Sequence, residues 1–420
     1  IPNYTHFDNL LYTCGLTFYD MLSWGLSLGR SLYISKKRVA KCLPTIVTEG
    51  LKGGVIYHDG QFDDSRLAIN LAQSIVEEGG CPLNKMKVEG IIHNASGKVA
   101  GVKIKDITSD AEYSVKAKSV INAAGVFVDD IILMDVPSTH RMVKPSQGIH
   151  LVFDKSFLNT DYAIMIPKTS DGRVLFAVPW HDKVVVGTTD IVREHAETEP
   201  KPLEEEIDFI MSTASLYMAK KPTRSDILSV FAGQRPLAAP KKEGKSTKEI
   251  SRSHKIFVSD NNLITITGGK WTTYRKMAED TVDKAISMNL LPAKKCTTMN
   301  YRIHGYRPKP DLTNHLYVYG SDMPAIEKLI KSGNGMNEKI HPKYDFTVAE
   351  VVWAVREEMA LTLDDVLGRR ARLLFIDARA AIEAAPKVAQ VMSKELGKDQ
   401  AWIDSQTESF IKLANNYIVK

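Results

Sequence analysis

Residues 263–275 read Leu-Ile-Thr-Ile-Thr-Gly-Gly-Lys-Trp-Thr-Thr-Tyr-Arg: a β-branched apolar run, two glycines and the start of a helical pattern. The run Leu263 to Thr267 predicts a short buried strand. Gly268 and Gly269 allow a sharp turn in which backbone comes close to a ligand, because glycine has no Cβ. The free N–H groups at the start of the following helix favour phosphate or another electron-rich group. On this local pattern a ligand site and plain α/β packing are equally good interpretations.

The composition is that of an ordinary globular protein. The chain has 420 residues, 44% hydrophobic and 25% charged, enough for two or three domains with substantial cores. A formal net charge of +5 suits anionic small molecules or an anionic membrane surface and is too weak to indicate nucleic acid. No apolar run approaches the about 18 residues that span a bilayer, and the amino terminus has no signal-peptide pattern. We therefore expect a protein that is soluble or peripherally attached to a membrane.

The cysteines are scattered without the CxxC spacing of metal sites. This argues against a metal site or a disulfide framework and fits a reducing cytoplasm. The four residues are Cys14, Cys42, Cys81 and Cys296.

The amino-terminal part begins with an amphipathic pattern over residues 8–27, followed by the basic segment Lys36-Lys37-Arg38. A helix packed on the core is the favoured interpretation, and a helix that touches a membrane is the alternative. Asp63-Asp64-Ser65 predicts the start of a strong helix with Leu67, Leu71, Ile75 and Val76, closed by Gly79-Gly80. Strand patterns follow at residues 99–104, 113–115 and 119–122, the last running into small residues up to Gly125.

Residues 143–256 have short alternating strands and turns, which predict a mostly antiparallel sheet inserted into the α/β part, with one helix around 203–218. A linker is expected over 292–310, and the chain beyond it is helical. Thr347-Val-Ala-Glu350 is a capping-box pattern. Pro386 is expected to begin a further helix that stops near Gly397, and residues 401–418 supply the last one.

Cationic residues beside glycines are the remaining candidates for chemistry, since the sequence has no serine-histidine-acid motif, P-loop or metal-ligand cluster. A lone histidine or arginine is more often a packing or surface residue than a catalytic one. Arg235 is the better case, because Pro236 stiffens the segment and Gly233 leaves space beside it, so that the guanidinium can bind phosphate or carboxylate through two hydrogen bonds. Gly187-Thr-Thr-Asp190 is also suggestive, but a strand-end turn capped by the aspartate explains it equally well. The candidates are Gly148-Ile-His150, Gly233-Gln-Arg235-Pro236, Ser251-Arg252 and Gly269-Lys270.

A series of motifs runs along nearly the whole chain. They are Tyr57-His-Asp-Gly-Gln-Phe-Asp-Asp-Ser-Arg-Leu67, Asn122-Ala-Ala-Gly-Val-Phe-Val-Asp129, Pro145-Ser-Gln-Gly-Ile-His-Leu-Val152, Val178-Pro-Trp180, Gly187-Thr-Thr-Asp190, Ala232-Gly-Gln-Arg-Pro-Leu237, Glu249-Ile-Ser-Arg252, Thr267-Gly-Gly-Lys-Trp-Thr-Thr-Tyr-Arg275 and Leu363-Asp-Asp-Val-Leu-Gly-Arg-Arg370. In this order and spacing they resemble the FAD-dependent (aerobic) glycerol-3-phosphate dehydrogenases, within the D-amino-acid-oxidase-like flavoprotein superfamily.

The resemblance implies an α/β plus α fold. An incomplete, Rossmann-like FAD-binding domain would cover residues 1–142 and 257–291, with an inserted, mostly antiparallel substrate-binding sheet over 143–256 and a C-terminal helical domain over 310–420. The family begins with a strand and a Gly-x-Gly-x-x-Gly turn that holds the FAD pyrophosphate. Nothing of the kind precedes Ile1 and no such motif occurs elsewhere, so we expect the chain to lack that segment.

The resemblance also implies a reaction, the oxidation of sn-glycerol 3-phosphate to dihydroxyacetone phosphate with hydride transfer to FAD. Electrons would pass to membrane quinone or, as in oxidase members, to oxygen. Arg235 and Arg252 would bind the substrate phosphate, and His150 would accept the proton of the C2 hydroxyl, with Arg235 a rival for part of that role. Lys270 would stabilise the negative charge that develops on the alkoxide and the reduced flavin.

Two further expectations concern the surroundings of these residues. Arg235, Arg252 and Lys270 would lower the pKa of His150 by like-charge repulsion and keep it neutral near pH 7. The residues expected to contact FAD are Gly125, Gly268, Gly269, Lys270, Trp271 and Thr272.

Other interpretations stay open. The chain could be another flavoprotein of the superfamily, such as an amine or 2-hydroxy-acid oxidase, or a fragment without tight FAD binding or catalysis. We expect a cytoplasmic location with peripheral attachment to the inner face of the cell membrane, and a homodimer is a further option. Arg369, Arg370 and Arg372 could face an acidic partner or membrane lipid, although a solvated or internally paired face is favoured.

Overall fold

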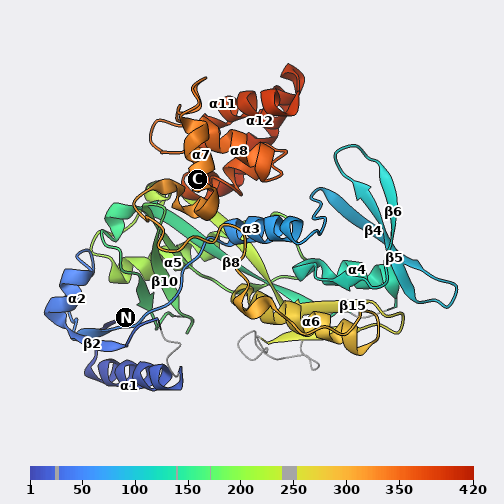
Figure 1. Ribbon diagram of the computed structural model, residues 1–420. Helices are drawn as coiled ribbons and strands as arrows, with labels where there is room; N and C mark the ends of the chain where they lie inside the picture. The colour runs from blue at the N-terminus through green and yellow to red at the C-terminus, as the bar shows by residue number, and fades with distance from the viewer. Residues whose placement is uncertain (24–27, 139–140, 171, 239–252) are drawn as a thin grey trace.

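The computed structural model describes residues 1–23, 28–138, 141–170, 172–238 and 253–420 (Figure 1). Helices of the C-terminal part gather at the top of Figure 1, and a three-stranded antiparallel sheet projects to the right. A larger sheet occupies the middle, and a small sheet with two helices lies at the lower left.

The middle sheet is antiparallel, as expected for the inserted domain. Its strand order is β12-β8-β11-β10-β9, and β13 also pairs with β8 along its whole length. Helix α5 lies between β12 and β13 in the chain. The bounds are β8 Val143–Asp154, β9 Ile164–Ile166, β10 Leu175–Trp180, β11 Lys183–Gly187, β12 Ile191–Val192, α5 Glu204–Tyr217 and β13 Ser229–Ala238, with 3-10 turns η2 Lys155–Phe157 and η3 Arg224–Asp226.

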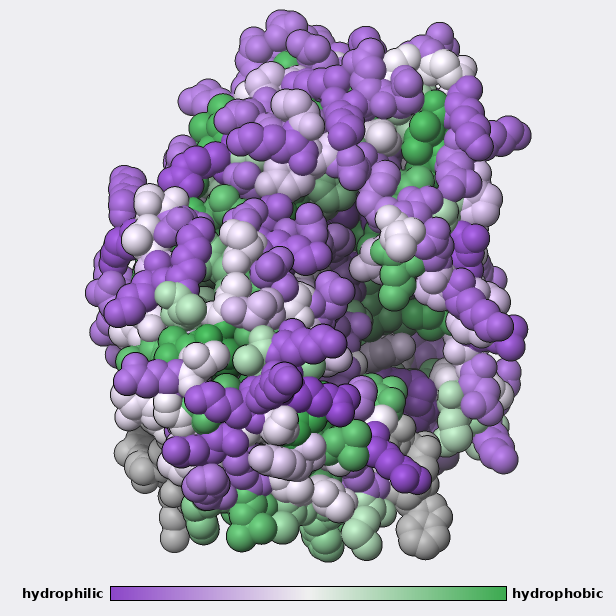
Figure 2. Space-filling view, turned by 90° about the vertical axis from the view of Figure 1, so that its left-hand side faces the viewer, coloured by the Kyte–Doolittle hydropathy of each residue, from purple (hydrophilic) through white to green (hydrophobic). Residues whose placement is uncertain are grey.

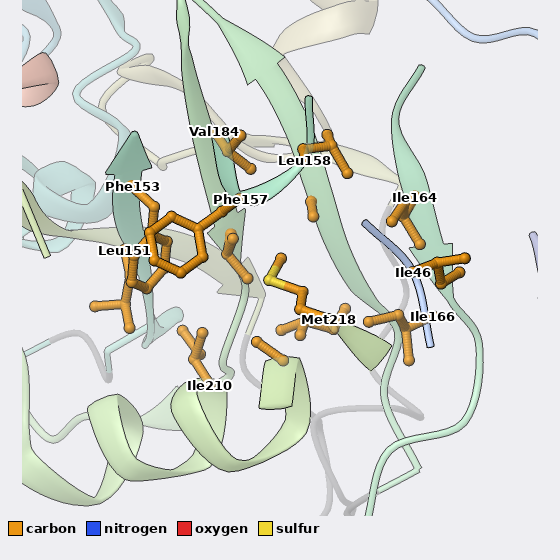
Figure 3. Packing of buried hydrophobic residues seen from close by; sticks show 14 of the residues in the cluster. Ile46, Leu151, Phe153, Phe157, Leu158, Ile164, Ile166, Val184, Ile210 and Met218 are labelled. Atoms are coloured by element: carbon orange, nitrogen blue, oxygen red, sulfur yellow. The ribbon is translucent and has the colours of Figure 1, made fainter. Parts of the chain in front are cut away.

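A small amino-terminal sheet, of order β1-β3-β2, shares its hydrophobic core with the middle sheet. In Figure 3, Ile46 lies beside Ile164 and Ile166 of β9, and the same cluster continues past Met218 to Leu151 and Phe153 of β8. Residues 1–56 therefore pack with the β-rich part, which differs from the expected boundary at 142/143. The bounds are β1 Pro2–Asn3, α1 His6–Leu22, β2 Leu32–Ser35, α2 Lys36–Cys42 and β3 Gly53–Ile56.

The part expected to bind FAD contains the sheet β14-β15-β7, in which β7 and β15 are parallel. The projecting sheet has the order β4-β5-β6. Strand β15 is the strand predicted at the start of the 263–275 stretch, and β14 begins a few residues before the expected boundary at 257. The bounds are α3 Asp64–Glu77, β4 Met86–His93, β5 Val99–Asp106, β6 Glu112–Lys116, β7 Ile121–Asn122, η1 Gly125–Phe127, α4 Val128–Asp135, β14 His254–Val258, β15 Ile264–Gly268, η5 Trp271–Thr273 and α6 Tyr274–Ser287.

The C-terminal part is helical, as expected. The predicted capping box at Thr347 is confirmed, since its backbone N–H donates to Glu350 Oε2 at 2.7 Å. The bounds are η6 Thr298–Asn300, η7 His315–Asp322, α7 Met323–Ile330, α8 Val348–Glu357, α9 Leu363–Leu367, α10 Leu373–Ile376, α11 Ala378–Leu396, α12 Gln400–Ala414 and η8 Asn415–Tyr417.

The prediction that Pro386 begins a helix is wrong, because Pro386 lies inside α11. The helix starts instead at Ala378, where the Asp377 side chain caps it by accepting from the Ala380 N–H at 3.0 Å. The run between them is rich in alanine, the best helix former, and several of its residues are buried in the domain core. The predicted stop at Gly397 is confirmed by its left-handed φ of 65°.

Helix α1 contradicts the favoured interpretation of its amphipathic pattern. It buries Asp8 and Asn9, because Asp8 is paired with Lys168 at 2.5 Å and Asn9 accepts from Asn3 at 2.9 Å. The apolar face points outward, and hydrophobic surface gathers at the lower end of the molecule, where α1 lies (Figures 1 and 2). Its large exposed side chains are Phe7, Leu10, Leu11, Phe18, Tyr19, Met21 and Leu22.

Helix α3 likewise buries polar residues and exposes part of its apolar face. Its N-cap is Asp63, as predicted, but its buried residues are Arg66, Asn70 and Ser74, while Ile75 and Val76 are exposed. Arg66 is buried because it forms an ion pair with Glu358, whose side chain is also buried. The apolar pattern of these two helices therefore identified the helices and misassigned their inner faces.

Candidate functional site

Two of the predicted site residues lie on the same face of the middle sheet. In the β8–β13 pair, Phe231 is opposite His150 and Arg235 is opposite Ser146. Gly148 and Gly233 form the pair between them. Because alternate residues of a strand share a face, His150 and Arg235 project to the same side, separated by a pair that has no side chains.

The guanidinium of Arg235 is held by the turn after β11. It donates to the Thr189 carbonyl oxygen at 3.3 Å and to Thr188 Oγ1 at 3.2 Å, and lies 3.7 Å from Asp190 Oδ1. Asp190 also accepts from the Ser146 hydroxyl. The motif Gly187–Asp190 thus orients Arg235, the candidate phosphate ligand. The sequence alone left open whether this motif has a role in the site or is a strand-end turn capped by Asp190.

Space for this arginine comes from Gly148 and not from Gly233. A Cβ at Gly148 would lie 2.7 Å from Arg235 Nη1 and 2.6 Å from the Thr189 carbonyl oxygen, whereas a Cβ at Gly233 would have nothing within 4 Å. The expectation that Gly233 leaves the space is therefore wrong. The two glycines occur side by side in the register, so only tertiary structure distinguishes them.

His150 has a pKa lowered from the usual 6.5 to about 4, mainly by burial and secondly by the positive charge of Arg235. The expected direction and the contribution of Arg235 are confirmed, but burial is the larger cause. His150 is therefore neutral at pH 7 and can accept a proton. Arg252, the second candidate phosphate ligand, lies outside the described residues.

A cavity lies along the same row of the sheet. His150 is opposite Gly187, Gly187 is opposite Phe176, and Phe176 is opposite Met165. Phe176 and Met165 line a cavity of about 470 Å³ that also reaches Tyr57. The cavity therefore lies on the same side of the sheet as the candidate base His150, at the other end of this row of cross-strand neighbours.

The parallel strands β7 and β15 both run into glycines at their carboxyl ends. The Asn122 amide donates to the Val128 carbonyl at 2.9 Å and to Thr265 Oγ1 at 3.3 Å, which joins the two strand ends. Gly125 has a φ of 59°, and a Cβ there would have nothing within 4 Å. The turn η1 that begins at Gly125 packs against β8 and β13. The carboxyl edge where nucleotides bind in α/β folds is thus placed beside the sheet that carries His150.

The structure of the Gly268-Gly269 turn is compatible with both interpretations of residues 263–275, a ligand site and plain α/β packing. Both glycines have positive φ, 73° and 74°. A Cβ at Gly269 would lie 2.6 Å from Met277 Sδ of α6 and 3.1 Å from His254 Cβ of β14, so this glycine lies closely packed between the two elements. The chain then makes a 3-10 turn over Trp271–Thr273, and α6 begins at Tyr274, within the stretch that predicts the start of a helix.

Lys270, Trp271 and Thr272 are exposed in this turn. The Lys270 carbonyl accepts from the N–H and the hydroxyl of Thr273, both at 2.9 Å. Contacts of the described residues do not join the Lys270 side chain to His150 or Arg235, so its assigned role stays a prediction.

The arginines of the C-terminal motif are paired internally, which confirms the favoured interpretation of Arg369, Arg370 and Arg372. Arg372 donates to Ser65 Oγ at 2.7 Å and to Asp64 Oδ1 at 3.2 Å. Arg370 lies 3.9 Å from Asp365, and Arg369 lies 3.5 Å from Asp364. Arg372 and the Arg66–Glu358 pair together fasten the start of α3 to the helical domain.

Comparisons with known proteins agree with this architecture. Residues 15–275 match the family described as FAD dependent oxidoreductase, and residues 262–403 match the C-terminal domain of alpha-glycerophosphate oxidase. The chain is 34% identical to a probable mitochondrial glycerol-3-phosphate dehydrogenase of Caenorhabditis elegans, over 100% of this chain and 60% of that protein. It is 33% identical to the mitochondrial glycerol-3-phosphate dehydrogenase of Saccharomyces cerevisiae, over 98% of this chain and 75% of that protein.

A solved structure is also similar. The glycerol-3-phosphate dehydrogenase of Bacillus halodurans, complexed with FAD, has a TM-score of 0.78 and 28% identity over 92% of this chain and 80% of that chain. The chain thus spans about three fifths of its relative from Caenorhabditis elegans and most of the bacterial structure. It belongs to the FAD-dependent oxidoreductases, in the family of the mitochondrial glycerol-3-phosphate dehydrogenases.

Proposed function

We propose that this chain carries the substrate face of an enzyme that oxidises sn-glycerol 3-phosphate to dihydroxyacetone phosphate with FAD. The observation that carries the proposal is the pairing of a neutral His150 with a cationic Arg235 on one sheet face, beside the carboxyl edge of β7 and β15. The names of the relatives support this choice of substrate.

The residues at the carboxyl edge fit one side of FAD. Gly125 faces open space, and the turn after β15 exposes backbone and side chains at the start of α6. We expect Gly125, Gly268, Gly269, Lys270, Trp271 and Thr272 to hold the cofactor there. When bound, FAD supplies the acceptor for the hydride from C2 of the substrate.

His150 would accept the proton of the C2 hydroxyl while the C2 hydrogen leaves as hydride. The substrate loses one proton and one hydride in this way, which is the two-electron oxidation of an alcohol to a ketone. The lowered pKa keeps His150 unprotonated at neutral pH, so that it acts as a base without first losing a proton.

Arg235 would bind the substrate phosphate. Its side chain is 40% exposed, while Thr188 and Thr189 fix its guanidinium from one side. A fixed guanidinium matches two phosphate oxygens at once, which a lysine does not. We propose Arg252 as its partner from the segment after β13, and Lys270 as the group that stabilises negative charge on the flavin side.

We also propose peripheral attachment to the inner face of the cytoplasmic membrane, with membrane quinone as the electron acceptor. The described helices include none that is both long and apolar enough to cross a bilayer. The exposed apolar face of α1 supports attachment, as does the basic helix α2, since both helices pack against β2.

Vesicle sedimentation tests the attachment. Replacing Phe18 and Leu22 with serine should release the protein from anionic vesicles. Leu216→Ser is the matched control, because Leu216 is equally exposed but isolated on α5. Release by the control to the same extent would contradict a specific role for α1, and hydrogen peroxide formation during turnover would favour oxygen over quinone.

The reaction is tested by flavin absorbance and a substrate panel. The purified chain is titrated with FAD and assayed with an artificial acceptor on sn-glycerol 3-phosphate, glycine, sarcosine and 2-hydroxyglutarate. Oxidation of sn-glycerol 3-phosphate alone supports the proposal. A chain that takes up no FAD supports the fragment interpretation, and preference for an amine or a 2-hydroxy acid supports another oxidase.

A further inference from the structure

The His150 ring is enclosed from two sides by its neighbours in the sheet. On β11, Gly187 is its direct cross-strand partner, and a Cβ at Gly187 would lie 2.8 Å from His150 Cγ. On β13, Phe231 is its partner, with the two rings stacked at a centroid distance of 5.2 Å and an angle of 20°. The imidazole is therefore packed between a bare backbone and an aromatic ring.

Phe231 is in turn supported by the C-terminal helical domain. It packs against the core of that domain, and its ring meets the ring of Phe375 edge to face at 4.9 Å. Phe375 meets Tyr417 edge to face at 5.4 Å. A continuous row of rings thus runs from His150 to the last helical turn of the chain.

Phe375 is itself well anchored. The Arg372 guanidinium lies 4.3 Å from the centre of its ring and is held by Ser65 and Asp64. Helix α10 is also tied to the beginning of β13, because Ser229 Oγ donates to the Leu374 carbonyl at 2.9 Å. Phe375 therefore cannot move away from Phe231 without breaking polar contacts on both sides.

We propose that Phe375 is a positioning residue for the reaction: through Phe231 it holds the His150 ring against Gly187 and keeps water from the Phe231 side of the ring. The helical domain would thereby complete the active site without contributing a group that touches substrate. This inference rests on the proposed role of His150 as the base.

The electrostatic consequences agree with this arrangement. Burial is the main reason that the pKa of His150 is low, and Arg235 on β13 is the charged neighbour that lowers it further. On β11 the neighbour is Gly187, which carries no charge. Loss of the Phe375 ring should admit water beside Phe231 and loosen the imidazole, so that the pKa of His150 rises.

The test measures the pKa of the His150 imidazole directly. The protein is labelled with ¹³C at histidine Cε1, the His150 resonance is assigned by its loss in His150→Gln, and its titration is recorded without substrate. Phe375→Leu should raise the pKa of His150 by about one unit or more. It should also lower kcat of the FAD-loaded enzyme several-fold with little change in KM, since Arg235 keeps its contacts. Phe375→Tyr retains the ring and should restore both values.

Phe410→Leu is the matched control, because Phe410 is a phenylalanine of the same core cluster with 3% exposure. It should leave the His150 titration unchanged even where it lowers stability. If Phe375→Leu does not fold, Phe231→Leu makes the same test from within the sheet. Equal His150 titration in the wild type and in the folded variant would overturn the proposal.

The readouts separate the two proposals. Unchanged turnover in His150→Ala would refute the histidine as base, while the titration would still decide whether Phe375 positions its ring. A normal fall in turnover for His150→Ala, combined with an unshifted titration in Phe375→Leu, would refute only the positioning role.

Discussion

Gly148→Ala should impair phosphate recognition without removing any charged group. The new Cβ would lie 2.5 Å from Thr188 Oγ1, 2.6 Å from the Thr189 carbonyl oxygen and 2.7 Å from Arg235 Nη1. All three contacts are shorter than carbon allows, and one is to backbone, so the guanidinium must move away from the turn that holds it.

The size of the effect follows from the contact that is lost. A hydrogen bond to a charged group contributes about 1.5–3 kcal/mol. If the displaced guanidinium loses one such bond to the substrate phosphate, kcat/KM should fall about 10- to 100-fold, since about 1.4 kcal/mol corresponds to a factor of ten. Most of the loss should appear as a higher KM, because the proton acceptor His150 remains in place.

Steady-state kinetics of the FAD-loaded protein with an artificial acceptor measure this, together with inhibition by inorganic phosphate. Phosphate should become a weaker competitive inhibitor to a similar degree. Gly90→Ala is the control, because its Cβ would make only an ordinary contact of 3.7 Å with Lys103 in the projecting sheet. A KM and a phosphate inhibition constant within twofold of the wild type in Gly148→Ala would refute the role of Arg235 in binding phosphate.

Four further predictions concern charge. His150→Ala should abolish most turnover, and in the wild type kcat, which does not depend on the titration of the free substrate phosphate near pH 6, should stay level from pH 8 down to pH 6, because the pKa of His150 is about 4; a fall centred near 6.5 would contradict this. Since the unfolded histidine binds its proton near pH 6.5 and the folded one only near 4, His150 should make the protein less stable as pH falls through this range, which urea unfolding of wild type and His150→Gln can compare. Glu358→Leu should cost about 3–5 kcal/mol in unfolding free energy because it leaves Arg66 buried without its charge partner, whereas the double change with Arg66→Met should cost much less. Lys270→Met should lower kcat more than it raises KM, and an effect on KM alone would remove Lys270 from the chemistry.

Local patterns in the sequence predict much of the fold. The strand, glycine pair and helix around residues 263–275 are confirmed, as are the antiparallel middle sheet, the capping box at Thr347 and the stop at Gly397. These features depend on side-chain alternation, caps and positive φ, each of which involves only a few neighbouring residues. The prediction for the start of α11 is wrong because proline is typical of a first helical turn, whereas the alanines before Pro386 already favour a helix.

The inner faces of α1 and α3 could not be predicted from periodicity. An apolar stripe shows that a helix is amphipathic, but which stripe is buried depends on partners elsewhere in the chain. Asp8 forms an ion pair with Lys168, and Arg66 forms one with Glu358, so the polar side of each helix is buried. These partners are far away in the sequence.

The candidate site also has a part that the sequence predicts and a part that only the tertiary structure determines. Residue types made His150 and Arg235 two of several cationic candidates, and the resemblance to the flavoprotein family gave them the roles of proton acceptor and phosphate ligand. Only the register of β11, β8 and β13 placed His150 between Gly187 and Phe231 and made Gly148 rather than Gly233 the source of space, and only the packing of α10 against β13 brought Phe375 behind the site. Chemical identity is a property of each residue and is readable in the chain, whereas burial and contact are properties of pairs that meet only when the strands and helices have packed.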